Sequence, residues 1–285
     1  MSERPTVTRP GEVQITREAH VPAQLLLKGR GLVECPRWHK GELWFADWTT
    51  GEIRVLEEKG QSRLVVPAKA PPLSFDFSPD NELFVVQSAS SSLMRFDGEG
   101  LKEFAVLGPG RWNEIVIDAA GRIYVNGPSL MLILPDGSVE TQAEGFQFPN
   151  GMALSKDGRT LVCAESWARQ LTAFDVAPDG RLGNRRIWAE LPGPPDGICF
   201  DSQEAIWYAD VPNAYCRRVR EGGEILDEVK VDRGAFACIL GGNNRSTLFI
   251  TTARWFGMDK MDQMAGTGQI VSVEVNAPGA GWPYN

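Results

Sequence analysis

The segment Lys40-Gly41-Glu42-Leu43-Trp44-Phe45 places a tight turn directly before an apolar triplet, and this pattern decides the fold because it recurs along the chain. Gly, Asn and Asp in the turns tolerate the positive φ that tight hairpins require. A repeat near 40 residues built from short strands is typical of a β-propeller, in which each repeat forms one blade. The six triplets, spaced 40, 40, 38, 45 and 42 residues apart, are Leu43-Trp44-Phe45, Leu83-Phe84-Val85, Ile123-Tyr124-Val125, Leu161-Val162-Cys163, Ile206-Trp207-Tyr208 and Leu248-Phe249-Ile250.

The sequence therefore predicts an all-β fold, a six-bladed β-propeller with four-stranded antiparallel blades. No amphipathic helical stretch competes with this interpretation. Apolar residues alternate from Val13 to Leu27, and we expect this segment to add the outer strand of the last blade. Closure by an N-terminal strand would remove an exposed sheet edge. Residues 1–10 are polar and expected to be disordered, and residues 11–285 are expected to form one propeller domain.

Composition limits the cellular setting and the partners. The chain of 285 residues carries a net charge of -8, which opposes nucleic acid or an anionic membrane surface as a partner. It contains no apolar run of transmembrane length and no secretory signal pattern. Its five cysteines lack C-x-x-C spacing, so we expect a reduced, cytoplasmic protein. The oligomeric state stays open.

Polar residues open most of the repeats, nine to eleven positions before each triplet. In a propeller, equivalent positions at the start of the innermost strands form a ring around one mouth of the central channel. Carboxylates that converge there repel and desolvate one another unless a cation or a proton compensates for their charge. The ring positions are Glu34, Ser74, Asn113, Asn150, Asp196 and an apolar member at Phe236 or Ala237.

The candidate ligands in this ring are all oxygen atoms, because neither His20 nor His39 belongs to it. Calcium takes ~6 to 8 oxygen ligands, including carbonyls and waters, and is therefore the favoured divalent cation. Magnesium, manganese and zinc are alternatives. Taken alone, an Asn-Gly or Asp-Gly pair is a common turn former. Their coincidence at equivalent repeat positions favours a ligand set.

Four motifs together carry a family resemblance, which extends from Gly31 to Val275. They are Gly31-Leu32-Val33-Glu34-Cys35-Pro36-Arg37-Trp38, Arg111-Trp112-Asn113-Glu114, Phe148-Pro149-Asn150-Gly151 and Pro195-Asp196-Gly197. With them, the chain resembles the calcium-binding six-bladed propellers of the regucalcin and gluconolactonase group. The resemblance implies that Glu34, Asn150 and Asp196 bind the metal. It also implies that Arg111 and Asn113 contact the substrate, with Asn113 close to the metal. Glu114, which stands where the family carries Asp, is a further predicted substrate contact.

The resemblance implies hydrolysis of lactones, and the residues are chemically suited to it. A divalent cation can polarise the ester carbonyl and stabilise the oxyanion that forms when water attacks. Asp196 is the candidate general base, and Arg111 can hold a substrate carboxylate or hydroxyl as a multi-donor fork. Cys35 and Cys199 neighbour the proposed ligands, but adjacent side chains of a strand point to opposite faces, so we expect both thiols between blades.

The chain departs from the family where related proteins often carry a lid, because only a short segment, residues 126–129, follows the third triplet. The long segment Ala253 to Gln269 could replace that lid. Aromatic and methionine side chains are expected in the loops at the mouth, and they favour a lactone larger or more apolar than a simple sugar lactone. These residues are Trp48, Trp167, Trp255, Phe256, Met258, Met261 and Met264, of which Trp167 and Trp255 are the predicted substrate contacts.

Two other functions stay open at this point. The same metal site could hydrolyse phosphotriesters or other esters. Alternatively, calcium could only stabilise the channel of a non-catalytic binding propeller, since fold alone never establishes activity. Arg111 favours the enzyme, because a purely structural ion would not need it.

Overall fold

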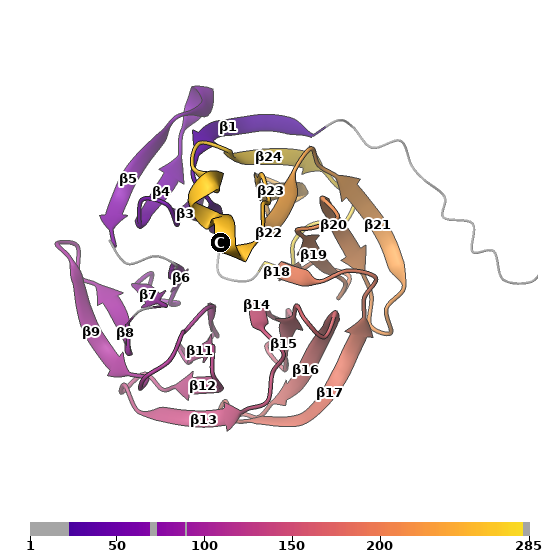
Figure 1. Ribbon diagram of the computed structural model, residues 1–285. Helices are drawn as coiled ribbons and strands as arrows, with labels where there is room; N and C mark the ends of the chain where they lie inside the picture. The colour runs from indigo at the N-terminus through magenta and orange to yellow at the C-terminus, as the bar shows by residue number, and fades with distance from the viewer. Residues whose placement is uncertain (1–22, 69–72, 89, 282–285) are drawn as a thin grey trace, which may run out of the picture.

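A computed structural model describes residues 23–68, 73–88 and 90–281, and these form six four-stranded antiparallel sheets around a central axis (Figure 1). The predicted fold class is confirmed. In Figure 1, β6, β14, β18 and β22 lie nearest the centre, whereas β5, β9, β13, β17 and β21 form the rim. Each predicted apolar triplet lies on the second strand of its blade, namely β3, β7, β11, β15, β19 and β23.

The strands of each blade follow one another in the chain from the axis to the rim, except in the last blade. The first three blades are β2 (Val33–His39), β3 (Glu42–Asp47), β4 (Glu52–Leu56) and β5 (Ser62–Pro67); β6 (Leu73–Phe77), β7 (Leu83–Gln87), β8 (Ser92–Phe96) and β9 (Leu101–Val106); and β10 (Ile115–Ile117), β11 (Ile123–Asn126), β12 (Leu130–Ile133) and β13 (Val139–Ala143). The others are β14 (Pro149–Leu154), β15 (Thr160–Glu165), β16 (Gln170–Val176) and β17 (Leu182–Glu190); β18 (Pro195–Phe200), β19 (Ile206–Asp210), β20 (Tyr215–Val219) and β21 (Ile225–Lys230); and β22 (Gly234–Gly241), β23 (Thr247–Ala253), β24 (Gly268–Glu274) and β1 (Gln24–Arg30).

The last blade closes the ring with the N-terminal strand. Strand β1 pairs antiparallel with β24, from Gln24 opposite Ser272 to Arg30 opposite Gly268. This closure was predicted, and within the described residues the strand comprises Gln24–Arg30. The predicted disordered N-terminus and the earlier part of the predicted strand lie outside the described residues.

The core lies mainly between neighbouring blades. Trp207, Tyr124, Tyr208 and Phe45 are fully buried, and burying large apolar side chains is the main favourable term in folding. Cys35 packs with Phe75 and other apolar side chains of the first two blades, as expected. Cys199 is likewise buried between blades, and all five cysteines are buried and free.

Helix is confined to two short 3₁₀ segments, η1 (Glu58–Gly60) and η2 (Met258–Met264), in the part of the chain that is described. No helix among these residues is long and apolar enough to span a membrane. Apart from these segments, turns and loops connect the strands. The innermost strands therefore form the wall of the channel, and the loops at its ends determine what can enter it.

Candidate functional site

The innermost strands contain β-bulges at four of the predicted ring positions, three of which carry polar residues. The register of β2 breaks between Glu34 and Arg37, that of β14 between Pro149 and Met152, and that of β18 between Pro195 and Ile198. A bulge inserts an unpaired residue and re-aims the side chains around it. The backbone thus departs from regular alternation where Glu34, Asn150 and Asp196 stand.

The glycines that follow these residues allow the innermost strands to approach closely. A Cβ atom on Gly151 would lie 2.6 Å from the carbonyl oxygen of Asp196 and 2.7 Å from the nitrogen of Ile198. A Cβ atom on Gly197 would lie 2.3 Å from the Cβ of Ala237. The Asn-Gly and Asp-Gly pairs therefore lie within strands rather than in turns, and their glycines serve close packing around the axis.

Two carboxyl groups of the ring lie in an environment that disfavours their ionised forms. Glu34 is 6% exposed, and burial raises its pKa to about 8, with the charge of Glu114 adding to the effect. Burial also raises the pKa of Asp196 well above its usual value, and the charges of Glu34 and Glu114 raise it further. Asp196 itself is partly exposed, so it can be reached from the mouth. The two carboxylates are thus close enough to repel each other.

Hydrogen bonds connect the two carboxamides of the ring to each other. The Nδ2 atom of Asn113 donates to the carbonyl oxygen of Pro149 at 3.0 Å and to Oδ1 of Asn150 at 3.3 Å. The Asn150 amide contributes in turn to the environment of Asp196, where its hydrogen bond lowers the carboxyl pKa. The structure thus brings Glu34, Asn150 and Asp196 together with Asn113, and their role as metal ligands stays a prediction.

Two positioning residues were missed by the sequence analysis. Asn126 accepts a hydrogen bond from the backbone N–H of Glu114 at 3.1 Å and donates to the carbonyl oxygen of Asn150 at 2.6 Å. Ser166 accepts from Asn150 Nδ2 at 3.4 Å and donates to the carbonyl oxygen of Pro195 at 2.7 Å. Each is a polar residue at or just beyond the end of an apolar second strand, which is the signal that could have found them.

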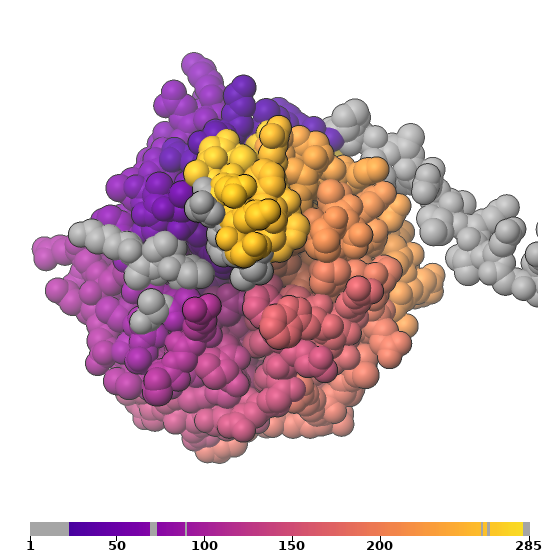
Figure 2. Space-filling model, viewed as in Figure 1, coloured from indigo at the N-terminus to yellow at the C-terminus, as the bar shows by residue number. Residues whose placement is uncertain are grey.

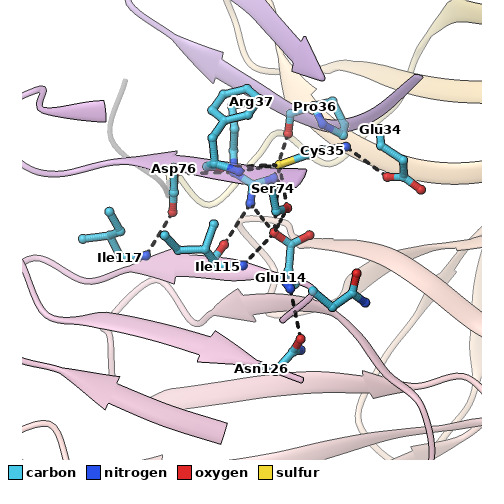
Figure 3. Close-up of polar contacts among 12 residues, drawn as sticks. Glu34, Cys35, Pro36, Arg37, Ser74, Asp76, Glu114, Ile115, Ile117 and Asn126 are labelled. Carbon is cyan, nitrogen blue, oxygen red and sulfur yellow. Dashed lines mark hydrogen bonds and ion pairs between the residues drawn. The ribbon is translucent and has the colours of Figure 1, made fainter. Parts of the chain in front are cut away.

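Glu114, a predicted substrate contact, is held by its neighbours through one carboxylate oxygen. Its Oε1 accepts hydrogen bonds from the Ser74 hydroxyl at 2.5 Å, from Arg37 Nη2 at 3.0 Å and from the Ile115 N–H at 2.8 Å (Figure 3). Ser74, the second ring position, therefore supports Glu114. These contacts fix where the Glu114 charge lies relative to Glu34 and Asp196.

The predicted aromatic contacts stand at the mouth in two different ways. Trp167 is 75% exposed and stacks on Phe148, with 5.0 Å between ring centroids and 17° between ring planes. Phe148 has a φ of 59°, a conformation that is strained for a bulky residue. Trp255 is partly buried and packs edge-on against Phe236 at 5.9 Å. Trp167 is thus the more available surface for a ligand.

Of the other residues predicted at the mouth, some pack against neighbouring blades and others are exposed to solvent. Arg111 is exposed and makes no hydrogen bond or ion pair with another described residue. Trp48 donates from Nε1 to the carbonyl oxygen of Leu73 at 2.7 Å, so it bridges the first two blades. Phe256 is 43% exposed. Arg111 and Phe256 therefore remain available for contact with a ligand.

The connection between β23 and β24 is anchored on this mouth. Its η2 segment is the yellow coiled ribbon near the centre of Figure 1, and Figure 2 shows yellow atoms standing over the middle of the same face. Met264 is fully buried beside Leu32 and Phe236. For Met258 and Met261 the structure describes the backbone but not the side chains. The role of this loop as a lid stays a prediction.

The donor set fits a hard divalent cation. Glu34 and Asp196 form no ion pair with any other residue in the described ranges, although their burial makes an uncompensated charge costly. Oxygen donors are those that calcium prefers. The described residues contain no group of three His, Cys, Asp or Glu side chains that could hold a metal. A cation here would therefore need the Asn113 and Asn150 oxygens and further ligands from solvent or substrate.

A thiol nucleophile does not fit this site. Burial raises the pKa of the Cys35 thiol to about 12, so the reactive thiolate is not populated near neutral pH. A hydrogen bond with the neighbouring Cys238 thiol, together with burial, also raises the pKa of Cys199 well above its usual value. The arrangement instead suits activation of water, because an acceptor carboxylate and a set of oxygen donors face the same mouth.

Known proteins share both the sequence pattern and the fold. Residues 32–254 match the SMP-30/gluconolactonase/LRE-like region family. The chain is 24% identical over 273 residues to a 6-deoxy-6-sulfogluconolactonase of Pseudomonas putida, covering 88% of this chain and 94% of that protein. It is 26% identical to a pentonolactonase of Haloferax volcanii, covering 83% and 85%. The structure of a calcium-binding protein, regucalcin, from Agrobacterium tumefaciens aligns with a TM-score of 0.75 at 17% identity, covering 91% and 95%.

Proposed function

This chain belongs to the SMP-30/gluconolactonase/LRE-like family, and on that premise we propose that it hydrolyses lactones with the help of a divalent cation. The observation that carries the proposal is the convergence of Glu34, Asp196 and two carboxamides at one mouth, where neither carboxylate has an ion-pair partner among the described residues. The names of two relatives as lactonases support the reaction class. The calcium-binding structural neighbour supports calcium as the cation.

Each residue of the mouth has a role in this reaction. Glu34, Asn150, Asp196 and Asn113 would hold the cation, which supplies Lewis-acid polarisation of the ester carbonyl when bound. Asp196 is partly exposed, and we assign it the role of general base, which accepts a proton from the attacking water. Arg111 has a guanidinium with no other described partner and would donate to polar substrate groups.

The proposed reaction needs no reactant other than the lactone and water. Water adds to the acyl carbon as its proton passes to Asp196, and the C–O bond of the ring then breaks. The departing alkoxide takes up that proton, and the product is a hydroxy acid. Because this acid ionises near neutral pH, each turnover releases one proton to solvent.

The substrate is proposed to carry an apolar or aromatic group. The exposed ring of Trp167 stacks on Phe148 beside the Pro149-Asn150 segment, so a flat or alkyl substituent of a lactone bound at Asn150 can contact it. Apolar surface at a cleft binds such groups better than it binds a bare sugar. We therefore assign the chain a bulkier or more apolar lactone than a simple aldonolactone.

Proton release on a panel of esters tests the proposed function. We expect the wild-type protein with Ca²⁺ to release acid from γ- and δ-lactones faster than from linear esters or phosphotriesters. Alkyl- or aryl-substituted lactones are expected to exceed gluconolactone in kcat/KM. Faster turnover of phosphotriesters would shift the assignment to that electrophile. A folded protein that hydrolyses none of these compounds would instead support the binding propeller.

Trp167→Ala tests the apolar substrate contact. We expect kcat/KM for substituted lactones to fall roughly tenfold or more, because a contact with one apolar group is worth about 1–3 kcal/mol, whereas unsubstituted lactones should change much less. Ile187→Ala is the control, since Ile187 is also exposed, at 56%, but lies on the outer strand β17. Both variants should fold like the wild type. An equal loss for both classes of lactone would contradict a role for Trp167 in selectivity.

A further inference from the structure

A buried arginine lies beside the carboxylates of the ring. Arg37 contacts Oε1 of Glu114 through Nη2 at 3.0 Å and Oδ1 of Asp76 through Nε at 3.4 Å. Its Nη2 also donates to the carbonyl oxygen of Ile115 at 2.9 Å, and Nη1 donates to that of Pro36 at 3.1 Å. Only 10% of this side chain is exposed. Figure 3 shows the guanidinium between the strands that carry these acceptors, so one cation joins three blades.

The contacts of Glu114 are unevenly shared between its two oxygens. Every hydrogen bond from a described residue to this carboxylate ends on Oε1, and the donors are Ser74, Arg37, the Ile115 N–H and the Cys35 thiol. An oxygen of a carboxylate has about two lone-pair sites, so Oε1 is saturated. Oε2 is left to face solvent or a ligand. Cys35, which directly follows Glu34, contacts Oε1 at 4.0 Å, and Asn126 joins the Glu114 N–H to the carbonyl oxygen of Asn150, so Glu114 lies beside the ring.

The charges around the channel do not cancel. The four carboxyl groups are Glu34, Asp76, Glu114 and Asp196, and Arg37 is the single basic side chain paired with any of them among the described residues. Asp76 also accepts from the N–H groups of Phe77 and Ile117, both at 2.9 Å. Arg37 therefore offsets part of the negative charge of the four carboxyl groups, and Glu34 and Asp196 are left without an ion-pair partner among the described residues.

We propose that Arg37 is a positioning residue and internal counterion that holds Glu114 beside the ring and weakens the attraction of the ring for a divalent cation. Nothing in the proposed reaction uses Arg37 directly. The inference rests on the proposed function only in that the ring binds a cation. Its consequence is that Arg37 tunes the affinity for Ca²⁺, so that removal of its charge tightens binding even though the fold loses an ion pair.

Calcium titration of the full-length protein tests this inference by calorimetry, with the unfolding temperature measured with and without Ca²⁺. For Arg37→Met we expect Ca²⁺ to bind about tenfold more tightly, because a nearby positive charge is gone. The variant should unfold at a lower temperature without Ca²⁺, because two buried carboxylates lose their partner. Saturating Ca²⁺ should then raise its unfolding temperature by more than it does for the wild type.

Three further variants separate charge from structure. Glu114→Gln keeps an acceptor for Ser74 and should bind Ca²⁺ about tenfold more weakly, because a negative charge near the cation is lost. Arg37→Lys keeps the positive charge and should bind Ca²⁺ as the wild type does. Arg218→Met breaks the similarly buried pair of Arg218 with Asp201, at 2.6 Å near the other end of β18. It should lower stability and leave Ca²⁺ affinity unchanged.

The outcomes distinguish this inference from the proposed function. Unchanged or weaker Ca²⁺ binding by Arg37→Met would overturn the inference and leave the proposed function standing. The same holds if Arg37→Met does not fold and Glu114→Gln binds Ca²⁺ as the wild type does. Absence of Ca²⁺ binding by the wild type would overturn both. Tighter binding by Arg37→Met together with weaker binding by Glu114→Gln is the expected result.

Discussion

Asp196→Asn is expected to remove lactone hydrolysis while the propeller stays folded. The substitution keeps the shape of the side chain but removes the proton acceptor and one of the two anionic cation ligands. Removing a general base alone typically costs about 10²- to 10⁴-fold, so we expect kcat/KM to fall by about 10³-fold or more. Steady-state kinetics by proton release measures this. Asp136→Asn, at an exposed turn between β12 and β13, is the matched control and should keep full activity.

The same variant has a predicted effect on stability with a definite sign. The pKa of Asp196 is raised in the folded protein, so its ionisation opposes folding once the pH rises above the unfolded value. In the absence of a cation, Asp196→Asn should therefore unfold at a higher temperature than the wild type at pH 8. Near pH 4 the difference should shrink. Asp196→Asn with more than a small part of the wild-type kcat/KM for lactones would contradict the role of Asp196 as general base.

Gly151→Ala is expected to damage both the fold and the site. The added Cβ would lie 2.6 and 2.7 Å from backbone atoms of Asp196 and Ile198, and backbone atoms cannot rotate away as a side chain can. Strands β14 and β18 would have to separate, which displaces Asn150 and Asp196 together. Overpacking of this kind costs about 1–3 kcal/mol or more. A displacement of ~1 Å at a catalytic site can lower activity about 10²-fold.

Gly183→Ala is the control for this prediction. Gly183 lies on the outer strand β17, and an added Cβ would meet no atom within 4 Å. We expect its unfolding free energy to stay within about 0.5 kcal/mol of the wild-type value, as for most surface substitutions. Thermal unfolding and Ca²⁺ titration of both variants provide the comparison. Wild-type-like stability and Ca²⁺ affinity in Gly151→Ala would show that the strands tolerate separation.

The repeat pattern was sufficient to predict the fold and most of the ring. A turn followed by an apolar triplet indicates local pairing between adjacent strands, and a period near 40 residues indicates that each repeat forms one blade. Equivalent positions in repeats must lie at equivalent places around an axis. For this reason Glu34, Asn150 and Asp196 could be assigned to one mouth without knowledge of any distance. The closing strand was predicted from the alternation of apolar residues.

The supporting residues could not be predicted in the same way, because their partners come from other blades. Arg37 belongs to a motif that was recognised, yet its contacts lie at residues 76, 114 and 115. Glu114 was predicted to contact the substrate, and nothing in the sequence indicated that its Oε1 accepts hydrogen bonds from Ser74 and Arg37 of other blades. The packing role of Gly151 was hidden because Asn-Gly pairs are more familiar in turns. Bulges cannot be read from apolar spacing, and they decide where these side chains point.

The central claim is that a divalent cation at the mouth is required for lactone hydrolysis. The most direct test measures proton release from a δ-lactone by the same protein sample before chelation, after the chelator and cation are removed, and after Ca²⁺ is restored. Elemental analysis of each sample gives the bound metal. The account predicts about one cation per chain, loss of hydrolysis without it, and recovery at near-stoichiometric Ca²⁺. Undiminished hydrolysis by the cation-free protein would contradict it.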